Sequence, residues 1–162
     1  FLYQKLHERG IKISSIQRQL SLLTKPTYED EEIKNVCIQN NVEYLAYSPL
    51  ALGMLTIPPD KSPNPTTFVR KKLFQRILPK TKELRGLLTD IGKKYSASQA
   101  QVALNWVRSH GAKPIVGIRN PLHAKDAIAA LTWSLTKNEK ETLDSYRNKC
   151  LTSMPQNPFT SP

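Results

Sequence analysis

The sequence is poor in several features that mark particular classes of protein. It has 2 cysteines among 162 residues, which excludes a disulfide-rich scaffold and a zinc site with four cysteine ligands. Its longest apolar runs are far shorter than the roughly 20 residues of a transmembrane helix, so we expect no membrane-spanning segment. A charged and then apolar leader is also missing at its start, and no signal peptide is expected. No residue pattern predicts a bound metal.

Acidic residues are scarce relative to basic ones. The chain has 24 lysines and arginines against 13 acids, a formal net charge of +11. The excess is concentrated between Lys61 and Lys94, where 10 basic residues accompany 2 acidic ones. Such an excess attracts nucleic acid, an anionic membrane surface or phosphorylated metabolites, although blocks of charge are usually solvated surface. The segment has few aromatics for base stacking before Tyr95, only Phe68 and Phe74, so nucleic acid is an unlikely partner.

Strands and helices alternate along the chain. Apolar and polar residues alternate at 16–20 as in a short strand, 42–47 is a brief apolar run suited to a buried strand, and 114–117 is a third short strand. Segments with helical spacing separate them. Strands separated by helices predict parallel pairing with right-handed crossovers. Because three strands cannot close into a barrel, the sheet must be completed either by further sequence or by a protein partner that covers its edges.

Local signals predict where the helices begin and where regular structure ends. Capping residues precede four helical segments, and these are Thr27, Ser98, Asn120 and Thr136. Residues 48–78 contain five prolines, and we expect a long connection there, which is normally functional or mobile. Residues 1–150 are expected to form the folded part, and the proline-containing tail at 151–162 to be extended or disordered.

Five segments of the chain resemble consecutive signatures of the aldo-keto reductases. They are Ser14–Leu23, Ala46–Thr56, Ser98–Trp106, Pro114–Asn120, and Trp133–Thr136 followed by Glu139. They occur in the same order as in the family, and their residues are most similar to those of its plant and cyanobacterial branch. The resemblance implies an α/β fold that is the C-terminal half of a (β/α)8 TIM barrel, with about three parallel strands and flanking helices.

The resemblance also implies an activity, the NADPH-dependent reduction of aldehydes or ketones to alcohols. The family's catalytic Asp, Tyr, Lys and His come from the first half of the barrel, so we predict no catalytic residue in this chain and expect it to be inactive alone. A small carbonyl compound is the implied substrate of a full barrel. The alternative is a non-catalytic, reductase-like subunit that docks in a larger assembly through its incomplete sheet and basic surface. The expected compartment is the chloroplast stroma or the cytoplasm.

The resemblance assigns a set of residues to the cofactor NADP(H). Tyr47 would stack on the nicotinamide ring, Gln17 would bond its carboxamide, and the loop after residue 47 would pass the pyrophosphate. The predicted cofactor-binding residues are Gln17, Tyr47, Ser48, Leu50, Gly53, Arg119, Asn120, His123 and Asp126. One departure from the family is Ala127, where an asparagine that helps to recognise adenine is usual.

The adenosine end of this predicted site also has support from simple physics. A strand that ends at Gly117 leads through Arg119 to a helix that begins with Asn120 and a proline. The unpaired amides of a helix N-terminus favour phosphate, and an arginine adds a full charge and a planar donor fork. By resemblance Arg119 would bind the 2′-phosphate of NADPH, and Asp126 would lie beneath the adenine. The alternative is a capped helix with one exposed arginine.

Overall fold

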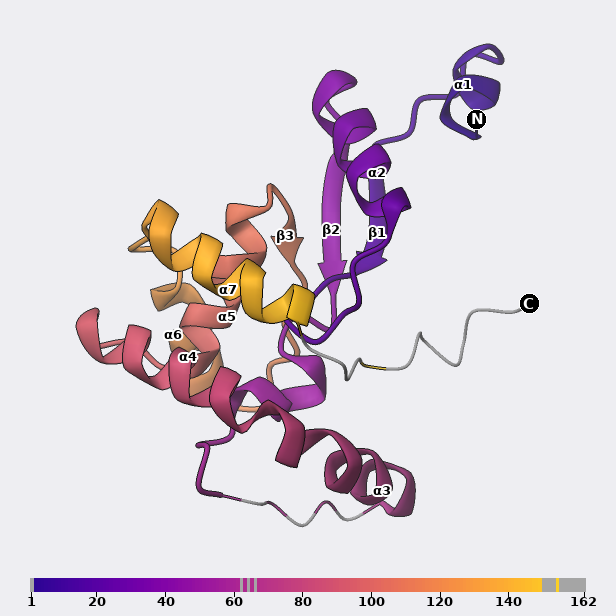
Figure 1. The fold of residues 1–162 in the computed structure, drawn as a ribbon. Coiled ribbons are helices and arrows are strands. Elements are labelled where there is room, and N and C mark those ends of the chain that lie inside the picture. Colours follow the sequence, from indigo (N-terminus) through magenta and orange to yellow (C-terminus); the bar gives the residue numbers. More distant parts are fainter. Residues whose placement is uncertain (1, 62, 64, 66, 150–153, 155–162) are drawn as a thin grey trace.

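A computed structural model describes residues 2–61, 63, 65, 67–149 and 154, and Figure 1 shows three strands with helices around them. The elements in chain order are α1 (Leu2–His7), β1 (Ser15–Gln19), α2 (Tyr28–Gln39), β2 (Glu43–Tyr47), the 3-10 helix η1 (Ala51–Thr56), α3 (Phe68–Ile77), the 3-10 helix η2 (Leu78–Thr81), α4 (Lys82–Lys94), α5 (Gln99–Ser109), β3 (Lys113–Pro114), α6 (Pro121–Ala129) and α7 (Lys137–Lys149). None of the described helices is long and apolar enough to cross a bilayer.

The strands form one parallel sheet in the order β1-β2-β3. This confirms the α/β fold with three parallel strands. Gln17 lies opposite Leu45 and Gln19 opposite Tyr47 in the β1–β2 register. The third strand is shorter than its apolar run predicts, because only Lys113 and Pro114 pair with β2. The β2–β3 contact continues for one further bond, from the N–H of Ile115 to the carbonyl of Ala46, at 2.8 Å.

The two faces of the sheet differ in burial. Tyr44 and Ala46 are buried on the face that meets the helices, and Arg18 on the same face bonds Asp30 of α2 at 3.1 Å. Since side chains alternate along a strand, Gln17 and Tyr47 lie on the opposite face. Gln17 is exposed and Tyr47 is half-buried. The described part of the chain therefore covers one face of the sheet more completely than the other.

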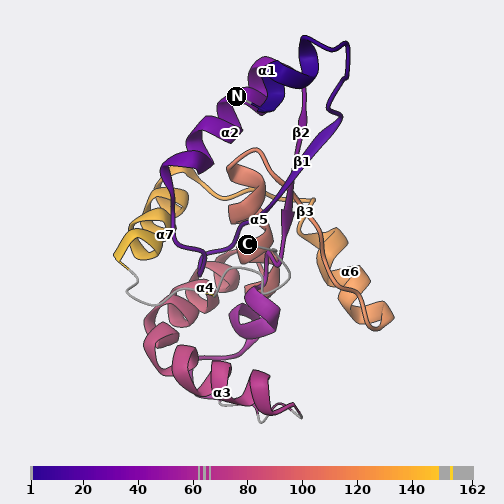
Figure 2. The same ribbon diagram turned by 90° about the vertical axis from the view of Figure 1, so that its right-hand side faces the viewer.

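The core is organised around α5, which lies among the sheet, α4 and α7 (Figures 1 and 2). Its Trp106 is fully buried, and the indole N–H donates to Asp144 of α7 at 2.8 Å. The Arg147 guanidinium lies 5.3 Å from the centre of the same ring. A buried tryptophan is stable when its ring is packed and its single donor is paired, and both conditions are met here.

The caps predicted from the sequence are formed at the helices that surround the later site. Ser98 Oγ accepts from the N–H of Gln101 at 3.1 Å, and Asn120 Oδ1 accepts from the N–H of His123 at 3.0 Å. Each bond satisfies one of the amide groups that a helix N-terminus leaves unpaired. These short-range bonds fix where α5 and α6 begin.

The cap of α7 also joins that helix to the end of α4. The Glu139 carboxylate accepts from the N–H of Thr136 at 3.0 Å, from Tyr95 Oη at 2.8 Å and from Lys94 Nζ at 3.2 Å. Burial would raise the pKa of Glu139, but these hydrogen bonds outweigh it and hold the pKa below its usual value. The carboxylate thus stays charged while three donors from two elements surround it.

The long connection expected at 48–78 is only partly irregular, so this prediction is corrected. It contains η1, and its last third is the helix α3, which continues into η2. Phe74 and Ile77 are the buried residues of α3, one helical turn apart. The outer positions of α3 carry basic side chains together with two apolar ones, which obscures the helical period. The predicted tail at 151–162 lies outside the described residues except for Met154, which is buried and whose N–H bonds the Leu23 carbonyl at 2.7 Å.

The two glycines of α4 provide a test of this packing. A Cβ atom at Gly92 would approach the Ala97 carbonyl oxygen to 2.5 Å, whereas one at Gly86 would meet nothing within 4 Å. We expect Gly92→Ala to lower the free energy of unfolding by about 1–3 kcal/mol through overpacking. Gly86→Ala should raise it by up to about 1 kcal/mol through helix propensity. Urea unfolding followed by circular dichroism measures both, and equal effects would contradict the close approach at Gly92.

Candidate functional site

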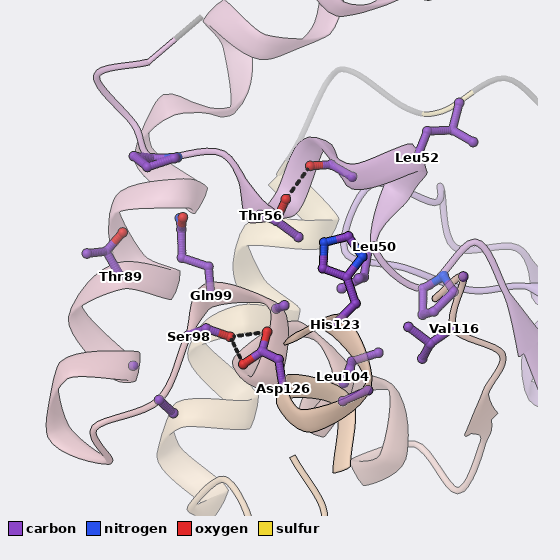
Figure 3. A pocket seen from close by; sticks show the side chains of 18 of the residues that line it. Leu50, Leu52, Thr56, Thr89, Ser98, Gln99, Leu104, Val116, His123 and Asp126 are labelled. Carbon is purple, nitrogen blue, oxygen red and sulfur yellow. Dashed lines mark hydrogen bonds between the residues drawn. The ribbon is translucent and has the colours of Figure 1, made fainter. Parts of the chain in front are cut away.

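A cavity of about 1070 Å³ lies at the carboxyl ends of β2 and β3. Its walls come from the loop after β2, from α4, from the start of α5, and from the segment between β3 and α6, as Figure 3 shows for Leu50, Thr89, Ser98 and Val116. Six residues of the predicted cofactor site line it, and these are Ser48, Leu50, Gly53, Arg119, His123 and Asp126. The fold therefore brings together side chains that are up to 78 residues apart in sequence, from Ser48 to Asp126.

Three predicted residues are not part of the cavity wall. Asn120 is exposed, and its side chain is used as the cap of α6. Gln17 and Tyr47 lie on the less covered face of the sheet, and Tyr47 directly precedes the lining residue Ser48. The structure therefore separates the predicted residues into a group in the cavity and a pair on the neighbouring sheet face.

The loop after β2 is tightly coiled. Ser48, Ala51 and Leu52 have φ angles of 53°, 49° and 56°, and Gly53 has a φ of 91°. Only glycine adopts such angles without a steric cost, so these three left-handed non-glycine residues within five positions must be held by their surroundings. The coil is closed by Thr56 Oγ1, which donates to the Gly53 carbonyl at 2.8 Å (Figure 3). The result is a compact rim over the end of β2.

Arg85 of α4 anchors the end of this loop, a role that the sequence did not indicate. Its side chain is buried, and Nη1 donates to the carbonyls of Pro58 at 2.6 Å and Ile57 at 3.2 Å. Nη2 donates to the carbonyl of Leu78 at 3.1 Å. Burial lowers the pKa of Arg85 from its ordinary value. One guanidinium thus links α4, η2 and the loop that carries Pro58 into the cavity wall.

Arg70 of α3 is a second cation with a role that the sequence did not indicate. In the sequence it is one of ten basic residues between Lys61 and Lys94. Its Nη2 donates to the Leu52 carbonyl at 2.8 Å, and its guanidinium carbon lies 5.4 Å from the centre of the Phe74 ring. The side chain lines the cavity, and its Nε is buried with no hydrogen-bond partner. A buried donor without a partner is costly, and a ligand with an acceptor at this wall would satisfy it.

Asp126 holds the opposite side of the cavity together. Ser98 Oγ lies 2.8 Å from both of its carboxylate oxygens, as Figure 3 shows, and Gln101 Nε2 donates to it at 2.7 Å. Ser98 thus accepts the cap bond of α5 and donates to α6 through one hydroxyl group. These bonds fix α6 against the start of α5, and the Asp126 carboxylate is engaged before any ligand arrives.

The cavity lining carries the cations Arg70, Lys93 and Arg119 and the carboxylates Asp60 and Asp126. Arg119 and His123 lie at the start of α6 and are exposed, while Arg70 and Lys93 approach from α3 and α4. The N-terminal turn of α6 adds the partial positive charge of its dipole beside Arg119. Among the described residues there is no group of three His, Cys, Asp or Glu side chains that could hold a metal ion.

Comparison with known families agrees with this arrangement. Residues 2–148 match the Aldo/keto reductase family. The chain belongs to this family. The resemblance read from the five sequence segments is thereby confirmed, and the three parallel strands with flanking helices match part of the (β/α)8 barrel of the aldo/keto reductases.

Individual relatives of this aldo/keto reductase chain show how much of a barrel it covers. It is 39% identical to the chloroplastic pyridoxal reductase of Arabidopsis thaliana over 98% of this chain and 43% of the relative. It is 26% identical to versiconal hemiacetal acetate reductase of Aspergillus parasiticus over 82% of this chain and 40% of the relative. The solved glycerol dehydrogenase of Gluconobacter oxydans shares its fold with a TM-score of 0.66 at 23% identity, over 98% of this chain and 56% of that one. The chain thus spans less than half the length of these two curated relatives.

The Arg85 anchor can be tested by proteolysis. We expect Arg85→Gln to release the loop that ends at Lys61 and to lower the free energy of unfolding by about 1–3 kcal/mol, because the loop carbonyls and that of Leu78 lose a charged donor. Trypsin cleavage after Lys61 should then rise by about tenfold or more, which corresponds to about 1.4 kcal/mol of lost local stability.

Cleavage after Lys12, which is exposed and distant in sequence, is the internal control and should not change. A uniform increase at both lysines would mean that the substitution acts through global unfolding. An unchanged rate at Lys61 would show that Arg85 does not hold the loop.

Proposed function

We propose that this chain forms the cofactor-binding part of an NADPH-dependent reductase that converts small aldehydes or ketones to alcohols. The observation that carries the proposal is the cavity at the strand ends, which collects Ser48, Arg119 and Asp126 in one lining. In parallel α/β barrels ligands bind at this end of the strands, and phosphate sites often follow the last two of them. Members of the aldo/keto reductase family generally use nicotinamide cofactors, which agrees with this placement.

The residues present fit a dinucleotide phosphate. The cavity volume of about 1070 Å³ lies at the upper end of the range for ligand pockets. Arg119 and Arg70 bring cations from two different walls, and the partnerless Nε of Arg70 offers a donor to an anion. Two separated cations match a ligand that carries phosphate groups at more than one position.

Each part of the chain has a role in this proposal. Arg119, beside the N-terminus of α6, would bind the 2′-phosphate, and His123 would lie next to it. Asp126 would orient the adenosine from a carboxylate that Ser98 already holds in place. The reduced nicotinamide supplies the hydride when it is bound.

The nicotinamide end of the site is proposed for the neighbouring sheet face. Gln17 and Tyr47 lie on that face, on adjacent strands, and next to Ser48 at the cavity edge. Tyr47 would pack one face of the ring and Gln17 would bond its amide. The group that protonates the product alkoxide is proposed to come from another part of the barrel, since we assign no catalytic residue to this chain.

We place the protein in the chloroplast stroma or the cytoplasm. The support is the similarity to a relative whose name places it in the chloroplast. Cys37, the described cysteine, is a free buried thiol, which is compatible with a reducing compartment.

A second candidate function, docking as a subunit, is favoured by the exposed apolar surface of α6. The helix has no buried residue, and Leu122 and Ile128 on it, with Leu131 two residues after its end, are each more than half exposed. Exposed apolar groups that gather on one element mark an interaction surface. We propose that the missing strands of a barrel, on the same or another polypeptide, cover this surface and the open edges of the sheet.

Arg119 is the residue to test for the cofactor. We expect Arg119→Ala to weaken the binding of NADPH by about 10- to 100-fold, the loss of one charge-assisted contact, and to change the binding of NADH little. Fluorescence quenching of Trp106 and Trp133 on titration measures both dissociation constants.

The matched control is Arg9→Ala, an exposed arginine in the turn after α1. Wild-type affinity for NADPH in Arg119→Ala, or an equal loss in Arg9→Ala, would contradict the assignment of the 2′-phosphate to Arg119.

The docking surface is tested with the N-terminal part of Arabidopsis pyridoxal reductase, the segment that this chain does not cover. Mixing should give a 1:1 complex by light scattering, and Ile128→Glu with Leu122→Glu should weaken it by tenfold or more, since charges would replace buried apolar groups. Ile38→Glu, an exposed apolar residue on α2, is the control. A complex that is insensitive to the α6 substitutions would place the contact elsewhere.

A further inference from the structure

The outer face of α3 combines exposed apolar and basic side chains in an unusual way. Phe68 and Val69, in the first turn of the helix, are 79% and 77% exposed. They are among the most exposed large apolar residues of the described chain. The helix packs on the rest of the protein through Phe74, Ile77 and the inward Arg70, and the exposed Phe68 and Val69 side chains are not part of that contact.

Basic residues follow this apolar pair on the same outer surface. Lys71, Lys72 and Arg76 are exposed, and no acidic residue occurs from 68 to 82. Within the described part of the chain none of these three cations pairs with a carboxylate. Elsewhere a lysine of similar exposure does, as Lys93 pairs with Asp90 at 3.1 Å. The positive charge of this face is therefore uncompensated.

The position of α3 makes the face accessible. In Figures 1 and 2 the helix lies at the end of the molecule opposite α1, beyond α4, and its outer side faces away from the other elements. The surface is thus an exposed helix face. Such a face, with apolar residues at its tip and cations along its flank, suits a partner that is broad, deformable and anionic.

We propose that the outer face of α3, defined by Phe68, Val69, Lys71, Lys72 and Arg76, docks on an anionic lipid surface. The phenylalanine and valine enter the boundary between headgroups and acyl chains, and the three cations meet the headgroup phosphates. Charge alone would equally suit a nucleic acid. The lipid surface is favoured because the apolar pair gains contact there, whereas a polyanion in water would leave both side chains exposed.

Docking in this orientation has a geometric relation to the cavity. Arg70 lies on the inner side of α3, bonds the Leu52 carbonyl and lines the cavity. The same helix therefore has its outer face at the membrane and its inner face at the rim formed by the loop after β2. The proposal does not depend on the proposed cofactor function, since it rests on the outer face alone.

The test is co-sedimentation of the full chain with vesicles of phosphatidylglycerol and phosphatidylcholine. We expect binding to these vesicles at about 0.15 M salt, and much weaker binding to pure phosphatidylcholine or at about 0.5 M salt. Replacing Lys71, Lys72 and Arg76 by alanine should lower the partition coefficient on the order of 100-fold, since each basic residue contributes about fivefold.

The matched control removes the same charge elsewhere. Lys12, Lys25 and Lys125 are exposed residues outside α3, and their triple alanine variant should retain most of the binding. An equal loss in both triple variants would show attraction by net charge alone and would overturn the proposal. Urea unfolding of each variant verifies that the fold is intact.

The apolar pair separates a lipid from a nucleic acid as the partner. Phe68→Ser with Val69→Ser keeps every charge and should weaken vesicle binding by tenfold or more. In a Phe68→Trp variant, lipids brominated in their acyl chains should quench the added fluorescence. The proposal would be overturned by unchanged vesicle binding in the serine variant or by the absence of quenching. It would also be overturned if a short RNA displaced the protein from vesicles and bound the wild type and the serine variant equally well.

Discussion

The parallel pairing of β1, β2 and β3 is the constraint on which the rest of the structure depends. Because the strands run in one direction, the segments that leave them emerge at the same edge of the sheet. The bond from Ile115 to the Ala46 carbonyl continues the β2–β3 pairing past the end of β3. It holds the segment that leads to α6 close to the loop after β2. The cavity exists because two connections that are distant in sequence must begin side by side.

Individual polar side chains fix the walls of this cavity. Arg85 holds the loop after β2 through the carbonyls of three separate residues, and Asp126 joins α5 to α6 through Ser98 and Gln101. Backbone carbonyls that cannot reach water need a donor, and a long arginine can supply several bonds from another helix. The positive charges near the cavity therefore fall into two groups. The Arg85 guanidinium is used in hydrogen bonds to backbone carbonyls, whereas the Arg119 side chain is exposed.

The features that the sequence predicted correctly depend on local signals. The features that it did not predict depend on long-range contacts. The caps at Ser98 and Asn120 depend on residues three positions away, so α5 and α6 could be located from the sequence. The parallel pairing of the strands followed from their alternation with helices. The role of Arg85 could not be predicted, because its partners in the loop after β2 lie more than twenty residues away and its spacing resembles that of any surface arginine. The helix α3 was missed because the five prolines in 48–78 predict a connection there. Its outer surface also carries apolar residues where a helix normally has polar ones.

The lack of buried side chains on α6 affects the stability of that part of the fold. The helix buries no side chain, and it is held by the Asp126 bonds and by Arg108, whose Nη1 donates to the Ala130 carbonyl at 2.6 Å. An element held by a few hydrogen bonds opens at a lower cost than the core around it, and its amide hydrogens exchange with solvent first. An anion bound at its first turn would stabilise only the closed form. By mass action, occupancy there and the ordering of α6 are therefore one coupled equilibrium.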